Sequence, residues 1–134
     1  MIKRHAAALL AALALGAAAA PALGQDAKKT IDQYKRAVAD RIVQANRLKL
    51  SKAGYRNITV VGYTLDRSGQ VTESWIVRSS GDHKLDDIAH NSFKKALPLP
   101  TPPEAIFGSE SAAHLAEAFV HTTDGSYKLQ TLIQ

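Results

Sequence analysis

The stretch "SSGDHKLDD", residues 79–87, joins a segment with strand periodicity to one with helical periodicity, so it decides how the chain folds back on itself. Ser80 or Asp82 is suited to cap a helix, because a short side chain with an oxygen accepts a hydrogen bond from a first-turn amide. The glycine between them lets the chain turn out of the strand. Asp86 and Asp87 would lie near the positive end of the helix dipole. We interpret the stretch as a strand-to-helix turn.

A catalytic or metal-binding cluster is the alternative interpretation of these residues. A serine nucleophile needs a base that a third group holds in place, and adjacency in the sequence does not supply this geometry. For a metal, His83, Asp87 and His90 at steps of four and three would share one exposed helix face, which suits zinc or nickel. A solvated polar face is the commoner outcome. We therefore expect neither a catalytic residue nor a metal site.

The residues after the turn predict a helix that ends before Pro98. Proline has no amide proton, and it disfavours helical geometry at the residue before it. Four of the five prolines fall within residues 98–103, which predicts an extended segment without regular pairing. The apolar stripe expected for this helix consists of Leu85, Ile88, Ala89, Ser92 and Ala96.

Two runs with a period of two precede the turn, at residues 60–65 and 71–77. Between them lies "DRSG", residues 66–69, whose glycine can take the positive φ of a short hairpin loop. The runs therefore predict an antiparallel hairpin. We expect Tyr63 and Trp75 to pack in the core or at its rim rather than line a ligand pocket.

An amphipathic helix is predicted upstream of the hairpin. Thr30 followed by Gln33 fits a capping box at its start, and Gly54 is a plausible stop beyond its end. The apolar positions recur at steps of three and four, as in a helix with one buried face: Ile31, Tyr34, Val38, Ile42, Ala45 and Leu48.

Residues 113–123 fit either a helix or a strand, and we predict a third strand there. The last eleven residues add a turn and at most a short strand. We expect Glu73 and Glu117 to be solvating charges at sheet edges rather than an acid pair. His114 and His121 are separated by an odd number of residues, so on a strand they point to opposite faces and cannot chelate one metal together.

The N-terminus has the pattern of a secretory signal peptide. Lys3 and Arg4 precede the apolar run of residues 6–20, and small residues then lead to an expected cleavage between Gly24 and Gln25. We expect residues 1–24 to be the signal peptide and residues 25–134 to be one periplasmic domain. An uncleaved membrane anchor is the alternative, and only then would the protein contact the membrane.

Composition excludes several classes of function. The chain has no cysteine, so it has neither a disulfide framework nor a thiolate nucleophile. Without Lys3 and Arg4 the net charge falls from +5 to about 17 − 2 − 12 = +3, with basic and acidic residues interspersed. Aromatic residues make up 6% of the chain, so neither a phosphate-tracking groove nor a stacking platform for nucleic acid is expected.

Residues 60–108 resemble the C-terminal domain of the TonB family of energy transducers. The shared pattern is an alternating strand, a turn written "DRSG", a second strand that ends in Ser-Ser-Gly, a helix that opens with Leu-Asp, and a proline-rich exit. The preceding helix is more similar to the start of the related TolA C-terminal domain. TonB usually has a Tyr-Pro segment there, and this sequence has none.

The resemblance implies an α+β fold in the order α-β-β-α-β, with a three-stranded antiparallel sheet packed against two helices. Domains of this family bind outer-membrane transporters, whose N-terminal segment is added as a strand at the edge of the sheet. By the resemblance, the strand at 113–123 is that edge. The residues expected to flank the partner are Leu115, Glu117, Phe119 and His121.

TonB itself keeps an uncleaved membrane helix and a long spacer rich in Pro, Glu and Lys, and neither is expected after Gly24. We therefore predict a periplasmic module that binds a transporter or another envelope protein by strand addition, with no cofactor and no catalysis. A homodimer through the sheet edge is also expected to be possible. The alternatives are a short membrane-anchored transducer and a small metal- or ligand-binding protein.

Overall fold

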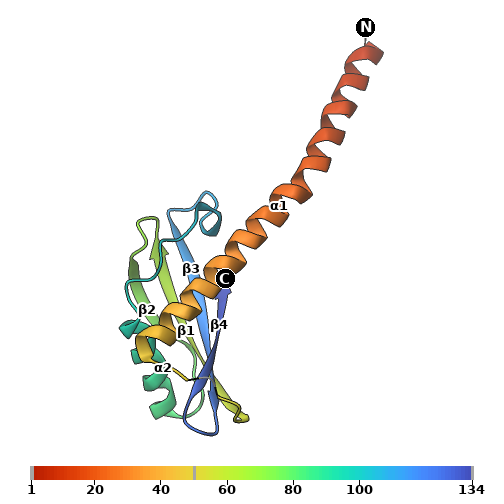
Figure 1. Cartoon of the computed structure of the whole chain (residues 1–134). Coiled ribbons are helices and arrows are strands. Elements are labelled where there is room, and N and C mark those ends of the chain that lie inside the picture. The colour runs from red at the N-terminus through yellow and green to blue at the C-terminus, as the bar shows by residue number, and fades with distance from the viewer. Residues whose placement is uncertain (1, 50, 134) are drawn as a thin grey trace.

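The computed structural model describes residues 2–49 and 51–133, and it has the predicted α+β fold (Figure 1). One additional strand extends the expected order of elements. In chain order the elements are α1 (Ile2–Asn46), β1 (Tyr55–Asp66), β2 (Val71–Arg78), α2 (His83–Lys95), the 3-10 helix η1 (Glu104–Ile106), β3 (Ala112–Thr122) and β4 (Tyr127–Ile133).

The sheet has four strands in the order β2-β1-β3-β4, all antiparallel, where the sequence predicted three. The fourth strand forms because a tight turn follows β3. The Asp124 carboxylate accepts hydrogen bonds from the Thr122 hydroxyl at 2.6 Å and the Ser126 amide at 3.0 Å, and Gly125 has φ +85°. Seven consecutive residues of β4 then pair with β3, a longer strand than we predicted.

Helix α1 is longer than predicted, since it runs from Ile2 without a break through the expected cleavage position. Thr30 is therefore no N-cap, and its hydroxyl instead donates to the Asp26 carbonyl at 3.0 Å. The helix ends at Asn46, and Arg47 has φ +52°. Within the described part of the chain, no helix is long and apolar enough to cross a membrane.

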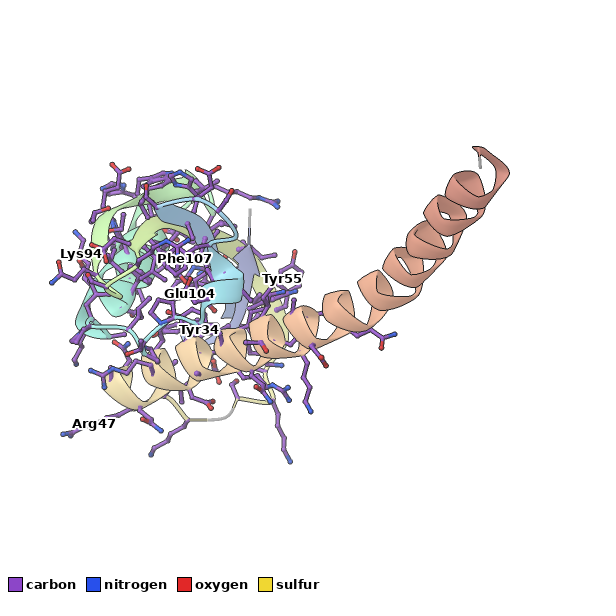
Figure 2. All side chains as sticks on the ribbon, turned by 90° about the horizontal axis from the view of Figure 1, so that it is seen from above. Tyr34, Arg47, Tyr55, Lys94, Glu104 and Phe107 are labelled. Atoms are coloured by element: carbon purple, nitrogen blue, oxygen red, sulfur yellow. The ribbon has the colours of Figure 1, made fainter. Side chains whose placement is uncertain are left out.

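Both helices cover the same face of the sheet, which we call the inner face. The side chains of Val61, Tyr63 and Leu65 on β1 are fully buried there, against Val38 of α1 and Phe93 of α2. Figure 1 shows α1 crossing the sheet and its first half extending beyond it. In Figure 2, Tyr34 lies on the side of α1 that faces the sheet and the η1 loop.

Side-chain hydrogen bonds from α1 and from the β1–β2 turn stabilise the connection between α2 and β3. Arg41 donates from Nε to the Ala96 carbonyl at 3.0 Å, and the Tyr34 hydroxyl donates to the Pro100 carbonyl at 3.0 Å. At the other end, Arg67 of the β1–β2 turn donates to the Gly108 carbonyl at 3.0 Å. The proline-rich segment is therefore held in place although it has no regular pairing.

Helix α2 begins as predicted, and Asp82 is its N-cap: the Asp82 carboxylate accepts from the Lys84 amide at 2.9 Å. The predicted apolar stripe is partly wrong. Ile88 is 44% exposed, whereas Phe93 and Asp86 are buried, because the helix is rotated so that Phe93 meets the ring of Tyr63 at a centroid distance of 4.7 Å.

The buried carboxylate of Asp86 holds the strand-to-helix turn together. It accepts hydrogen bonds from the hydroxyl of Ser79 at 2.5 Å and from the hydroxyl and amide of Ser80 at 2.7 and 2.8 Å. It also accepts from the Thr59 hydroxyl on β1 at 2.8 Å. One carboxylate therefore ties α2, the end of β2 and β1 to one another.

Asp86→Ala is expected to lower the free energy of unfolding by about 3 kcal/mol. The substitution leaves the buried hydroxyl of Thr59 and the partly buried donors of Ser79 and Ser80 without their acceptor, and an unsatisfied buried group costs about 1–3 kcal/mol. Urea unfolding followed by circular dichroism measures the effect.

The matched control is Asp87→Ala on the same helix turn, where the side chain is 62% exposed, and it should change stability by less than about 0.5 kcal/mol. Equal effects of the two substitutions would show that the carboxylate of Asp86 does not hold the turn.

Candidate functional site

The structure places the predicted edge residues inside the sheet. Strand β3 pairs with β1 on one side and with β4 on the other, so the prediction that residues 113–123 form a free edge is wrong. The reason is β4, which takes the position that the sequence left open. The four residues expected to flank a partner strand all point to the inner face and are buried: Leu115, Glu117, Phe119 and His121.

Glu117 departs furthest from its predicted role. It was expected to be a solvated charge at a sheet edge, but its side chain is fully buried in the middle of β3. It lies across from Val61 on β1 and Thr131 on β4. Its charge and, to a greater degree, burial raise the pKa of Tyr63. Glu73, by contrast, is exposed as predicted.

Strands β2 and β4 are the two edge strands of the described sheet, and their edges differ. The pairing of β2 with β1 contains two register shifts, at Val60/Val61 and at Thr64/Leu65. Such irregularities twist an edge and make it a poor template for a further strand. Strand β4 pairs with β3 in unbroken register over its whole length. The edge that is suited to accept another strand is therefore β4.

A furrow runs between α1 and β4, directly beside this edge. It consists of two adjoining hollows with volumes of about 200 and 220 Å³. Ala39 of α1 and Leu129 of β4 line both hollows, and Val43 and Leu48 add apolar surface at one end. We call this feature the α1–β4 furrow. A strand added to β4 would point alternate side chains into it, because strand side chains alternate between the two faces.

Basic residues border the α1–β4 furrow along its length. Lys35 and Arg36 lie at one end, and Lys49 lies at the other. Asp32 on the same helix lies 3.9 Å from Lys35 Nζ and 2.8 Å from Lys28 Nζ. The furrow thus combines an apolar floor with a basic rim, which favours a ligand that has apolar and acidic side chains.

The hydrogen bonds of Asp86 continue through Thr59 to His121. The Thr59 hydroxyl has one proton and gives it to Asp86, so it must accept from Nε2 of His121, which is 2.8 Å away. This assigns the proton of the neutral imidazole to Nε2. Tyr127 of β4 meets the same ring edge-on at a centroid distance of 6.3 Å. His121 is therefore a core residue that links β1, β3 and β4.

The surroundings shift the pKa values of both ends of this relay downward. Burial lowers the pKa of His121, as does Arg56, while Asp86 and Asp82 act in the opposite direction. Burial raises the pKa of Asp86, but the hydrogen bonds from Ser79, Ser80 and Thr59 outweigh it and hold that pKa well below its usual range.

The structure does not bring together the residues of a serine nucleophile with a base, or those of a metal site, within residues 79–90. The hydroxyls of Ser79 and Ser80 donate to Asp86 rather than to a histidine. His83 is 3.7 Å from the carboxylate of Asp87, but Nε2 of His90 faces Ser74 of β2 at 2.9 Å, so the three do not form one ligand set. Among the residues that the structure describes, no group of three or more His, Cys, Asp or Glu could hold a metal ion.

The domain has an α+β fold with one face of its sheet covered and an edge strand beside a furrow. In the comparison with protein families, the family model described as TonB C terminal matches residues 31–111. The chain belongs to the TonB C-terminal family, whose domains interact with proteins of the cell envelope. The comparisons with curated proteins and with solved structures gave no match.

The family match ends one residue before β3. It covers the part of α1 that packs on the sheet, the β1–β2 hairpin, α2 and the proline-rich connection, which is also where the sequence motifs lie. Strands β3 and β4, of which β4 is the candidate edge, are outside it. The family is thus established by the scaffold, and the edge is described by the structure alone.

Acidification is expected to destabilise the fold in two steps. A histidine whose folded pKa is depressed binds its proton more readily in the unfolded chain, so stability falls as the pH drops below about 6.5. His121 and His90 both contribute, since burial lowers the pKa of each. Asp86 contributes stability above its unfolded pKa near 4, which is lost as the pH falls further.

Urea unfolding between pH 8 and pH 3 measures the profile. His121→Gln keeps a donor for Thr59 without a titrating proton, so it should flatten the step near pH 6, while His83→Gln at an exposed position should leave the step unchanged. A step that survives when both His121 and His90 are replaced would contradict this assignment.

Proposed function

We propose that the domain is a periplasmic recognition module that accepts an extended segment of an envelope protein as a fifth strand on the free edge of β4. The observation that carries this proposal is the unbroken β4 edge lying beside the α1–β4 furrow. Backbone amides and carbonyls of β4 would pair with the segment, while alternate side chains enter the furrow. The domain performs no reaction in this proposal.

The direction of the backbone groups supports addition at β4. The Thr122 amide donates to the Ser126 carbonyl at 2.9 Å, which is the first rung of the ladder. In an antiparallel pair, the rungs recur at every second residue. Lys128 and Gln130 therefore direct their amides toward β3, and the amides of Leu129 and Thr131 point away from the sheet, where a fifth strand would meet them.

Charge and shape narrow the class of partner. Basic side chains at both ends of the furrow attract acidic residues, and its floor of Ala39, Val43 and Leu129 accepts apolar ones. A segment that combines acidic and apolar residues fits both properties. Flexible N-terminal segments of outer-membrane transporters and other unstructured tails of envelope proteins are the candidates in this compartment.

Disulfide trapping tests where the partner strand lies. The chain has no cysteine, so single cysteines can be introduced without background. Cysteine at Lys128 or Gln130 of β4 should form disulfides with a cysteine scanned along the N-terminal segment of a transporter from the same cells. The exposed positions Thr72 and Glu73 on β2 should not. Trapping confined to the β2 positions would refute the proposed edge.

The pair Thr131→Pro and Thr131→Ala provides the control for backbone pairing. Proline removes an amide that points away from β3, so it should raise the dissociation constant of the trapped segment at least tenfold and change thermal stability little. Alanine keeps the amide and should bind like the parent. Equal binding by the two variants would show that the segment is held by side chains alone.

Export by residues 1–24 is part of the proposal, supported by the basic start, the apolar run and the small residues before Gln25. Mass spectrometry of the protein isolated from its own cells should therefore find a soluble chain that begins at Gln25. An intact, membrane-bound N-terminus would instead favour the short membrane-anchored transducer.

A further inference from the structure

The face of the sheet opposite the two helices carries apolar side chains. The β1 residues that alternate in sequence with the buried Val61, Tyr63 and Leu65 point to this side, and we call it the outer face. Ile58, Val60, Trp75 and Val120 are half-buried there, and Val77 is 47% exposed. A sheet face that meets only water usually carries polar side chains, whereas the centre of this face is apolar.

Small residues form the floor of the outer face. Gly62 and Ala116 lie side by side in the register, with Trp75 as the neighbour of Gly62 on β2. A Cβ atom at Gly62 would lie 2.5 Å from Cγ2 of Val77 and 3.0 Å from Cε2 of Trp75. Glycine at this position therefore lets the side chains of Trp75 and Val77 approach the backbone of β1 closely.

Two opposite charges lie symmetrically about this centre. Glu73 is paired with Thr64 and Arg78 is paired with Val60, and these two β1 residues lie two positions to either side of Gly62. Both charged side chains are exposed. Thr64 donates to Oε1 of Glu73 at 3.1 Å and contacts Nδ1 of His114 at 3.2 Å, which fixes the carboxylate on the outer face.

We propose that the outer face binds a second copy of this chain, sheet against sheet. A two-fold axis along the row of Trp75, Gly62 and Ala116 sets Trp75 against its own copy. The same axis places Glu73 opposite Arg78 of the other chain, and Arg78 opposite Glu73. The charge pattern is therefore self-complementary about one axis, as an isologous dimer requires. The packing buries the exposed Val77 and leaves the β4 edge open.

The size of the outer face sets the strength of the dimer. Four strands at about 4.8 Å spacing, with about 3.4 Å per residue along β1 from Ile58 to Thr64, give a patch of roughly 15–20 Å by 20 Å. Two such patches bury roughly 600–800 Å² in total, which is below the roughly 1,200 Å² of stable specific interfaces, so the dimer is expected to be weak and to dissociate on dilution. It is independent of strand addition, since the strand edge and the outer face are different surfaces.

Charge exchange tests the proposal by analytical ultracentrifugation of the protein as isolated from cells. The parent should show a monomer–dimer equilibrium. Glu73→Arg and Arg78→Glu should each raise the dissociation constant by roughly 100-fold, because each substitution creates two like-charge pairs across the axis. A 1:1 mixture of the two variants should restore association as a heterodimer, which shows that both variants are folded.

Asp87→Arg and Lys94→Glu on α2 are matched exposed charges away from the outer face, and they should leave association unchanged. Val77→Glu is a second variant that should abolish it. A parent that stays monomeric at all concentrations would overturn the proposal. So would a dimer that ignores the charge exchange, and its disruption by Thr131→Pro would then identify pairing at the β4 edge as the cause.

Discussion

The carboxylate of Asp86 is the interaction on which the rest of the structure depends. It lies where the chain leaves β2 and enters α2, and it accepts hydrogen bonds from Ser79 and Ser80 at this change of direction while also bonding β1 through Thr59. Through the same threonine it is joined to His121 on β3. The same carboxylate fixes the start of α2 on the inner face, where Phe93 contacts the ring of Tyr63.

Strand β4 has the largest consequence for function. By pairing with β3 it closes the edge that a three-stranded sheet would leave open, and it presents a new edge beside α1. In the proposed function, the side chains that a partner meets come from the helix and β4, with apolar residues on the floor of the furrow and lysines and Arg36 at its rim. Recognition by this domain is then a property of two elements at opposite ends of the sequence.

The sequence predicted what local patterns encode. The hairpin around Gly69, the N-cap at Asp82 and the helical face with Val38 and Ile42 are all present, because each depends on residues close in the chain. The family followed from the same local motifs, and the family match confirms it.

Three features were beyond local reasoning, since each depends on contacts between distant segments. Burial of Asp86 requires hydroxyls from β1 and from the end of β2. Burial of Glu117 and the interior position of β3 require β4, whose seven residues alternate too briefly to distinguish a strand from a frayed end. A clear sequence pattern therefore indicated that a feature depends on residues close in the chain, and it did not indicate how important that feature is to the site.

Amide hydrogen exchange of the ¹⁵N-labelled domain, followed by NMR, tests the account most directly. In the free domain, the amides of Lys128 and Gln130 should be protected and those of Leu129 and Thr131 should exchange quickly. Addition of the trapped partner segment should protect Leu129 and Thr131 as well. Rapid exchange throughout β4 in the free domain, or protection by the partner that appears only on β2 or β3, would contradict the assignment of β4 as the recognition edge.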